Sequence, residues 1–305
     1  MPSQSRNEID RVARAVRRRV LDHTLRNQGG YLSQACSSAE ILASLYLEVL
    51  RLGPSEGPSE PPPFAGVPGP DNPRAGTGAA YNGPRAPELD RFIFSPVHYA
   101  LVLYAVLIEV GRLAPGALHQ FNVDGSTVEL IGAEHSPGHE VTAGSLGQAI
   151  SQAAGIALGR KLKVEAGRVW VFMSDGEFQE GQTWEAFAAS AYHGLDNLGV
   201  YVDVNGQQCD GAMADVMTIE PLADRLRSFG AVVREVNGHD ADQLVDASVR
   251  RNGERGPLVV LCRTDPCRGI ELLRNRAPKL HYVRFSDDAE FRAFERTLEV
   301  WEGER

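Results

Sequence analysis

The sequence predicts a three-layer α/β fold, with a mostly parallel central sheet and helices on both faces. Residues 170–174 and 199–204 are short apolar runs of strand length, and the Ala-rich stretch 179–193 between them carries aromatic residues at helical spacing. A strand–helix–strand unit of this length places its two strands parallel, joined by a right-handed crossover. The chain of 305 residues, 43% of them hydrophobic, is long enough to bury a large core. We expect residues 1–305 to form a single domain.

The composition narrows the class of protein. A net charge of −9 argues against binding to nucleic acid, and the sequence holds no apolar run long enough to span a membrane. Residues 1–19 are polar and basic without an apolar core, so they do not resemble a secretory signal. Cys36, Cys209, Cys262 and Cys267 are scattered without a C-x-x-C pair, which is typical of reduced thiols. We therefore expect a cytoplasmic protein.

The N-terminal part predicts two helices and an insertion. Residues 7–26 have apolar side chains on one stripe and arginines mostly opposite, which is the pattern of an amphipathic helix. A second helix is expected at about 37–50, with Ser37 or Ser38 as its N-cap. Residues 53–87 are rich in Pro and Gly, lack periodicity and are far longer than an ordinary connection. We interpret this segment as an insertion, either mobile without function or a lid or partner contact.

The rest of the chain alternates between strands and helices. Residues 89–111 predict a short strand followed by an apolar helix. A later helix carries Ala149, Ala153 and Ala157 on one face, where small side chains allow another helix to approach closely. Either a subunit interface or ordinary core packing accounts for these alanines. Further helices are expected at 219–229, 241–251 and 286–305, and further strands at 231–236 and 257–263.

Polar side chains follow the two strands of the central unit where each strand ends. Asp175 follows the first strand and Asn205 follows the second, each next to a glycine. Because parallel strands end at the same edge of a sheet, these two side chains should lie side by side, where open α/β sheets bind ligands. Carboxylate and amide oxygens suit Mg²⁺, which takes its remaining ligands from water and phosphates. The pair therefore predicts a phosphate-bearing ligand, unless both residues merely cap helices.

These residues belong to a longer pattern that resembles the thiamine-diphosphate motif of the transketolase family. The matching groups are Asp175-Gly176-Glu177, Glu180-Gly181, Trp184-Glu185-Ala186, Leu195-Asp196-Asn197-Leu198 and residues 203–211. Other parts of the family pattern match at Gly29-Gly30, Leu32-Ser33, residues 40–42, Asp90-Arg91-Phe92, Ser95, His98 and residues 144–147. The sequence departs from the pattern at Asn27, where the family has a histidine that lines the substrate channel. It also departs at Pro96-Val97 and at Ser174, where the family has Lys-Gly and Gly.

The resemblance implies a thiamine-diphosphate-binding fold and a role for each matched residue. Mg²⁺ would be held by Asp175, Asn205 and the backbone carbonyl of Gln207. The remaining cofactor contacts would come from His98, Gly144, Ser145, Leu146, Gly176 and Glu177. His98, Glu180 and His281 would act in catalysis, with His98 at the diphosphate and substrate and Glu180 in a carboxylate link at the subunit interface.

The resemblance covers residues 7–285, which correspond to the N-terminal half of a full-length transketolase. It implies an N-terminal subunit that binds thiamine diphosphate and Mg²⁺ and transfers a two-carbon ketol unit from a ketose or ketose phosphate to an acceptor. A companion subunit would supply the pyrimidine-binding domain, in an α₂β₂ assembly. Two alternatives stay open: the α subunit of a 2-oxoacid dehydrogenase or acyloin-forming enzyme, and a non-catalytic regulatory subunit.

Overall fold

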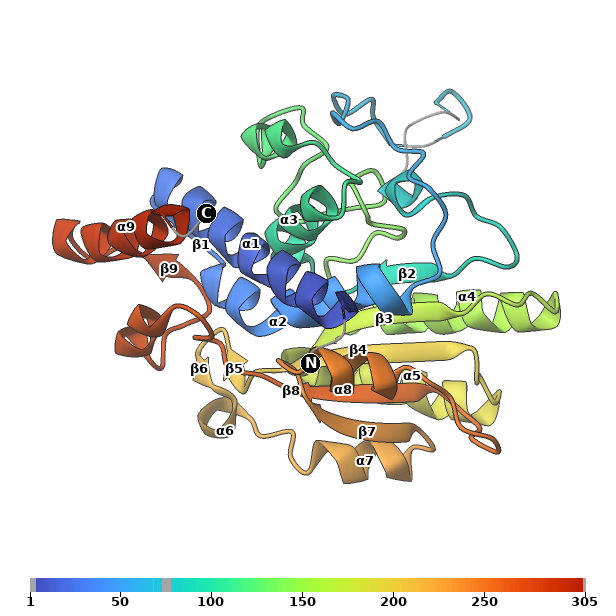
Figure 1. The fold of residues 1–305 in the computed structure, drawn as a ribbon. Helices are drawn as coiled ribbons and strands as arrows, with labels where there is room; N and C mark the ends of the chain where they lie inside the picture. Colours follow the sequence, from blue (N-terminus) through green and yellow to red (C-terminus); the bar gives the residue numbers. More distant parts are fainter. Residues whose placement is uncertain (1–3, 68, 73–77, 304–305) are drawn as a thin grey trace.

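A five-stranded parallel sheet forms the centre of the molecule (Figure 1). The computed structural model describes residues 4–67, 69–72 and 78–303. In spatial order the strands are β2 (Arg91–Phe94), β3 (Val169–Ser174), β4 (Leu198–Val204), β8 (Leu258–Arg263) and β7 (Val232–Asn237). Every neighbouring pair is parallel, which confirms the predicted α/β class.

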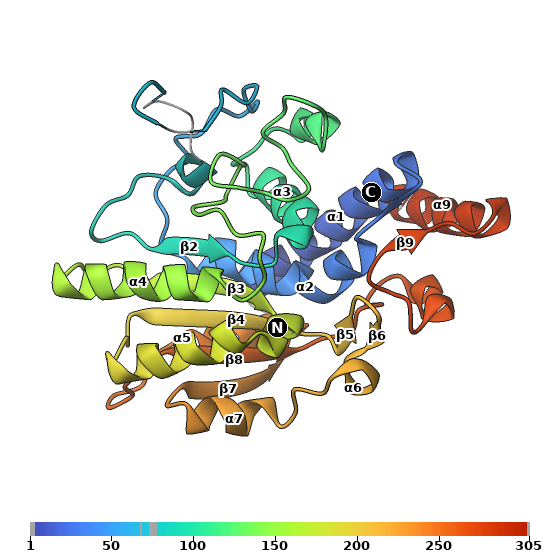
Figure 2. The ribbon, with the colours of Figure 1, turned by 180° about the vertical axis from the view of Figure 1, so that it is seen from behind.

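Helices cover both faces of this sheet. One face carries α4 (Ala149–Leu162), α5 (Gly181–Tyr192) and α7 (Leu222–Ser228), which stand in front in Figure 2. The other carries α2 (Leu32–Ser44), α3 (Ala100–Glu109) and α8 (Ala241–Ala247), with α1 (Gln4–Arg26) packed over α2. The last helix, α9 (Asp288–Gly303), lies against α1.

Short elements complete the chain. Two small antiparallel pairs join β1 (Gly29–Gly30) to β9 (Val283–Arg284) and β5 (Gln207–Gln208) to β6 (Gly211–Ala212). A one-turn helix, α6 (Met213–Val216), follows the second pair, and a π-helix extends α2 over Leu45–Val49. Turns of 3₁₀ helix lie at Gly78–Asn82, Val97–Tyr99, Pro115–Gln120, Asp175–Gln179 and Glu271–Arg276.

The core follows the two-residue period of the strands. Along β3, the fully buried Trp170 and Phe172 face the layer of α1, α2 and α3, whereas Val169, Val171 and Met173 face α4 and α5. A strand that is apolar on both sides is expected where helices cover both faces of a parallel sheet. This burial fixes β3 and β4 in the middle of the sheet, so their ends are rigid positions for a site.

The expected start of the second helix was wrong. Helix α2 begins at Leu32, and Ser37 and Ser38 are fully buried in its interior, where the hydroxyl of Ser38 donates to the carbonyl of Gln34. Gly29–Gly30, just before the helix, pairs with β9 from the far end of the chain. This distant pairing sets where the helix starts, and no local pattern in residues 26–38 encodes it.

The alanine face of α4 packs inside the chain itself. Ala149, Ala153 and Ala157 are completely buried in the core beneath the sheet, so they cannot meet another subunit. On the far side of the same helix, a Cβ added at Gly155 or Gly159 would meet no described atom within 4 Å. Ordinary core packing therefore accounts for the alanines, and the open side of α4 carries glycines.

The Pro- and Gly-rich segment 53–87 is anchored at several described points, while residues 68 and 73–77 lie outside the described residues. Backbone bonds join Ala114 to Ser59 and Phe64 to Gly125, and the ring of Phe64 lies 4.4 Å from that of His135. The insertion thus rests on residues 114–135. Among the described residues, no helix is both long and apolar enough to cross a membrane.

Candidate active site

A cavity of about 370 Å³ opens at the carboxyl ends of β3 and β4. Open parallel sheets bind ligands at this edge because the loops after neighbouring strands converge there. The lining residues are Tyr31, Ser33, Gln34, Val97, His98, Tyr99, Ile131, Gly144, Leu146, Ser174, Asp175, Gly176, Gln179, Glu180, Asn205, Gln207, Gln208, Cys209 and His281. This described lining contains no lysine and no arginine, so positive charge for a ligand must come from elsewhere.

Asp175 supplies the carboxyl group at the floor of the cavity. It begins the 3₁₀ turn after β3, is 2% exposed, and accepts a 2.8 Å hydrogen bond at Oδ2 from the backbone N–H of Gly206 after β4. Burial, together with the nearby carboxylate of Asp203, raises the pKa of Asp175 to about 8. A cation bound beside this carboxyl group would favour its charged form, so the position suits a metal ligand.

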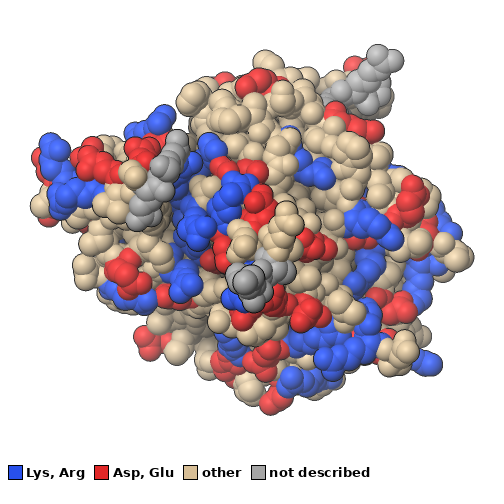
Figure 3. Space-filling view, viewed as in Figure 1, with Lys and Arg blue, Asp and Glu red and all other residues tan. Residues whose placement is uncertain are grey.

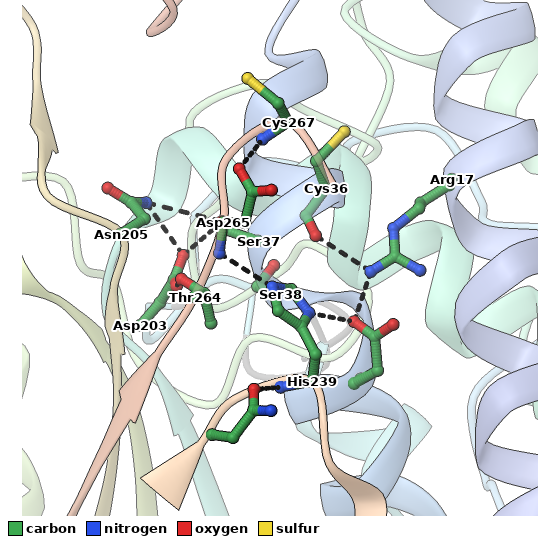
Figure 4. Close-up of polar contacts among 12 residues, drawn as sticks. Arg17, Cys36, Ser37, Ser38, Asp203, Asn205, His239, Thr264, Asp265 and Cys267 are labelled. Atoms are coloured by element: carbon green, nitrogen blue, oxygen red, sulfur yellow. Dashed lines mark hydrogen bonds and ion pairs between the residues drawn. The ribbon is translucent and has the colours of Figure 1, made fainter. Parts of the chain in front are cut away.

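Asn205 is held in one orientation by its neighbours. Its amide nitrogen donates to the hydroxyl of Tyr99 at 3.0 Å. The same nitrogen donates to Asp203 Oδ2 at 3.1 Å (Figure 4). Its amide oxygen, Oδ1, accepts from the backbone N–H of Gln207 at 2.9 Å. Because the nitrogen is engaged by these oxygen atoms, the carbonyl side of Asn205 is left for a ligand.

Asp203 helps to fix the orientation of Asn205 by accepting a hydrogen bond from its amide nitrogen. It is fully buried, and its carboxylate accepts hydrogen bonds from Ser37 at 2.6 Å and from Thr264 at 2.5 Å, besides those from Tyr99 and Asn205. Burial raises the pKa of this carboxyl group, and these four donors oppose that shift. The sequence pattern contained Asp203 but gave it no role.

Glu177 holds two loops together beneath the cavity. Its fully buried carboxylate accepts from the backbone N–H of Ser174 at 2.9 Å and of Gly147 at 3.1 Å, and from the hydroxyl of Ser95. It therefore ties the end of β2 and the 144–147 loop to the turn after β3. Its side chain is not part of the cavity lining, although the resemblance placed it at the cofactor.

His98 and His281 form one wall of the cavity with Tyr31. The ring centroids lie 5.0 Å apart for the two histidines, 5.6 Å for Tyr31 and His98, and 5.4 Å for Tyr31 and His281. Burial, reinforced by the neighbouring His281, lowers the pKa of His98 to about 3, and burial also lowers the pKa of His281. Both imidazoles are therefore neutral at physiological pH and act there as hydrogen-bonding groups.

Most of the predicted site residues meet in this cavity. His98, Gly144, Leu146, Asp175, Gly176, Glu180, Asn205, Gln207 and His281 all line it. Ser145 is exposed and does not line it. Asn27 also lies outside: it is exposed at the end of α1, where its amide donates to the carbonyl of His23 at 2.8 Å.

Sequence reasoning missed Tyr31, Gln34, Tyr99, Gln179 and Cys209 as lining residues. Tyr31 and Gln34 flank the matched Leu32-Ser33 pair, and Gln179 and Cys209 fall at variable positions inside the matched motif. Their positions beside or inside the matched motifs could have identified them, because residues next to a motif in sequence lie close to it in the structure.

The residues present fit a diphosphate and a divalent cation. Among the described residues, no group of three or more His, Cys, Asp and Glu is placed to hold a metal, so a cation here would have few protein ligands. Mg²⁺ commonly binds that way, with phosphates and water completing its shell. Gly176 leaves room for a ligand, since a Cβ there would meet nothing within 4 Å, and the buried side-chain oxygen of Gln207 lacks a hydrogen-bond partner in the described structure.

The sequence matches a protein family described as transketolase, thiamine diphosphate binding domain, over residues 79–276. A transketolase family protein of Sinorhizobium fredii is 34% identical over 274 residues, which cover 88% of each chain. An apulose-4-phosphate transketolase subunit from Actinobacillus succinogenes is 30% identical and covers 94% of this chain and 95% of its own length. The 6-deoxy-6-sulfo-D-fructose transketolase subunit of a Clostridium species is 28% identical, with 94% of each chain covered.

Solved transketolase structures share the fold. The enzyme of Pichia stipitis superposes with a TM-score of 0.68 at 20% identity, and that of Leishmania mexicana with 0.67 at 22%. They cover 97% and 100% of this chain, but only 44% and 46% of their own chains are matched. The chain therefore spans less than half the length of these solved structures.

Proposed function

We propose that this chain, which belongs to the transketolase family as an N-terminal, thiamine-diphosphate-binding subunit, transfers a two-carbon ketol unit together with a companion subunit. The observation that supports this most is the meeting of Asp175 and Asn205 in a cavity whose described lining has no lysine or arginine. A metal ion bound between them would supply the positive charge that a diphosphate needs. The donor set is the one that Mg²⁺ uses.

In this proposal, Asp175, Asn205 and the backbone carbonyl of Gln207 hold Mg²⁺ against the diphosphate. The open backbone at Gly176 and the imidazole of His98 lie beside the same space and would contact the phosphates. Gly144 and Leu146 would border the rings of the cofactor. When bound, thiamine diphosphate supplies the carbanion chemistry of ketol transfer, and the protein supplies its binding and orientation.

The neutral imidazoles of His98 and His281 would form hydrogen bonds with the sugar rather than provide positive charge. His98 and His281 each have a nitrogen that donates and one that accepts, and Tyr31 packs against both rings. Such groups can orient the hydroxyls of a ketose and hold a proton in transit. Glu180, which is exposed and lines the cavity, would join a carboxylate link across a subunit interface.

A companion subunit would supply the part of a full-length transketolase that this chain does not match. Relatives of nearly the same length are named as subunits of transketolases, whereas the solved transketolases are more than twice as long. We infer a companion that carries the pyrimidine-binding domain and covers the open cavity, with two copies of each chain forming two sites. The four cysteines are unpaired, which suits assembly in a reducing cytoplasm.

The substrate class is a ketose, with any anionic group bound outside this half of the site. Two relatives are named for a sugar phosphate and a sulfonated sugar. The described cavity lining offers hydroxyl, amide and imidazole groups but no cation for a phosphate or sulfonate. That charge would therefore be met by the companion subunit.

The test is reconstitution with the companion, a protein of about this length identified from a neighbouring gene or by co-purification. Neither protein should give ketol transfer from xylulose 5-phosphate by itself, and the mixture should form a stable complex that is active only with thiamine diphosphate and Mg²⁺. Oxidative decarboxylation of a 2-oxoacid by the mixture would favour the dehydrogenase alternative. A complex that binds the cofactor yet processes neither substrate class would favour a regulatory role. Robust transfer by the isolated chain would refute the split enzyme.

A further inference from the structure

A second cavity, of about 570 Å³, lies beside α1 and the residues that follow β7 and β8. It is bounded by α1, by the turn before α8, and by the segment that follows β8. Its lining residues are Arg6, Asp10, Arg14, Arg17, Glu40, His239, Asp265, Arg268, Gly269, Glu271 and Arg274. None of these residues lines the cofactor cavity. Nothing in the proposed function uses this second cavity.

Arginine dominates the lining, and two of the five guanidinium groups have no partner in the described part of the chain. Arg17 pairs with Glu40, and Arg274 pairs with Asp265 and Glu271. Within residues 4–67, 69–72 and 78–303, Arg14 and Arg268 make no side-chain hydrogen bond or ion pair. Figure 3 shows basic side chains gathered over α1 on this face, mixed with acidic ones.

The acidic side chains of the cavity are mostly neutralised already. Glu40, Asp265 and Glu271 each accept from an arginine of the same cavity. Asp10 is the one lining carboxylate without a hydrogen bond or ion pair to a described residue, and it lies one helical turn before Arg14. The unpaired positive groups, Arg14 and Arg268, thus outnumber the unpaired negative one within the described lining.

Arg17, a buried residue of this cavity, has a hydrogen-bond donor without an acceptor among the described residues. Its side chain is only 5% exposed, and one terminal nitrogen donates to Glu40 and, at 2.9 Å, to the carbonyl of Cys36. Its Nε atom is buried and has no acceptor among the described residues. A buried donor without an acceptor is unfavourable by roughly 1–3 kcal/mol, so the described chain does not fully satisfy the guanidinium group of Arg17.

We propose that this second cavity binds the phosphate group of a small phosphorylated molecule. Arg14 comes from α1 and Arg268 from the segment after β8, so the two free guanidinium groups can grip an anion from two elements. Guanidinium groups match the oxygens of phosphate in bidentate geometry, and the dianion has acceptors enough for both arginines and for Arg17. The cavity has the size of a small-molecule site and an opening for the rest of the ligand.

The position of this site gives it a physical connection to the cofactor cavity. Glu40 is shared by Arg17 and by Nδ1 of His239, which lies 3.0 Å away, and Nε2 of His239 accepts from the backbone N–H of Asp265 at 2.8 Å (Figure 4). The residue before Asp265, Thr264, donates to Asp203, which in turn holds Asn205. A ligand that displaces Asp265 therefore acts on Thr264, which is two contacts from Asn205, and a ligand that displaces Arg17 acts on the same chain through Glu40 and His239.

The experiment is isothermal titration of inorganic phosphate, and of ribose 5-phosphate, into the full chain. Saturating thiamine diphosphate and Mg²⁺ are present, so that the cofactor cavity is not free to bind the probe. We expect a single site per chain for each probe. Arg14→Gln or Arg268→Gln should weaken binding about tenfold each, and the double variant should weaken it about a hundredfold, as expected when charged hydrogen bonds are lost.

The matched control removes two positive charges elsewhere. Arg255 and Arg296 are exposed and form no ion pair with a described residue, so Arg255→Gln with Arg296→Gln changes the net charge equally. This variant should bind phosphate like the wild type, and circular dichroism should show that all variants are folded. The proposal fails if the wild type binds neither probe at millimolar concentration, or if the cavity and control variants lose affinity equally. Failure of thiamine diphosphate to bind would appear in its own titration and would bear only on the proposed function.

Discussion

Under the two proposals, both cavities bind a phosphate group, but with opposite kinds of side chain. The described lining of the cofactor cavity has no lysine or arginine and holds the buried carboxyl group of Asp175. The second cavity is lined by five arginines, two of them without a partner among the described residues. Asp203 links residues beside both of them, because it bonds to Asn205 of the first cavity and to Thr264, which precedes Asp265 of the second.

The difference indicates two kinds of anion binding. In the proposed function, a diphosphate binds in the first cavity together with a divalent cation, so its binding depends on both ligands. In the second, guanidinium groups can accept an anion directly, without a metal. Metal dependence therefore distinguishes the two, and removal of Mg²⁺ by EDTA should abolish binding in the first cavity alone.

The largest expected effect is at the metal position of the first cavity. Asp175→Ala removes the only carboxylate among the proposed Mg²⁺ ligands, so the variant should lose the stabilisation that thiamine diphosphate and Mg²⁺ give the wild type. At a ligand concentration one hundred times Kd this stabilisation is about 2.7 kcal/mol, and thermal unfolding with and without both ligands measures it. Asp215→Ala, at an exposed position, serves as the control. Equal stabilisation of the Asp175 variant and the control would place the metal elsewhere.

A smaller effect is expected at Asp203, the buried carboxylate that bonds to Asn205 and Thr264. Asp203→Asn replaces one of the two acceptor oxygens with an amide group that faces hydroxyl and amide donors, so the free energy of unfolding should fall by about 2 kcal/mol. Thiamine diphosphate should also bind more weakly, because Asn205 loses its support. Urea unfolding measures the first change and a cofactor titration the second.

The matched variant for Asp203→Asn is Thr264→Val. It removes a single donor to Asp203 and leaves Ser37, Tyr99 and Asn205 in place, so the loss should be about 1 kcal/mol. If Asp203→Asn were no more destabilising than Thr264→Val, the carboxylate of Asp203 would not be the group that stabilises this cluster of four hydrogen-bond donors.

The sequence predicted the first cavity well because its chemistry lies next to strand ends. The end of a buried strand is visible as the end of an apolar run, and parallel pairing then places Asp175 beside Asn205. The backbone bond from Gly206 to Asp175 is the structural counterpart of that prediction. The sheet class and most helices followed from the same periodicity.

The remaining features depend on contacts between residues far apart in the chain. The start of α2 depends on the pairing of Gly29–Gly30 with β9, and the burial of Ala149, Ala153 and Ala157 depends on which side of α4 faces the sheet. The second cavity combines residues from α1, α2 and the segments after β7 and β8. No local pattern brings Arg14 together with Arg268, so sequence reasoning could not find this site.

The smallest expected effect is at Asn27, where the family pattern has a histidine that lines the substrate channel. Here Asn27 is exposed, and its amide donates to the carbonyl of His23 at the end of α1 rather than lining the cavity. Asn27→His should therefore change stability by no more than about 0.5 kcal/mol, as is usual for surface positions, and should leave cofactor affinity unchanged. Tyr31→Ala is the contrasting variant, because it removes ring contacts to His98 and His281, each of which contributes roughly 0.5–1.5 kcal/mol. Cofactor titration and the donor–acceptor profile of the reconstituted complex measure both variants, and a profile altered more by Asn27→His than by Tyr31→Ala would return Asn27 to the substrate channel.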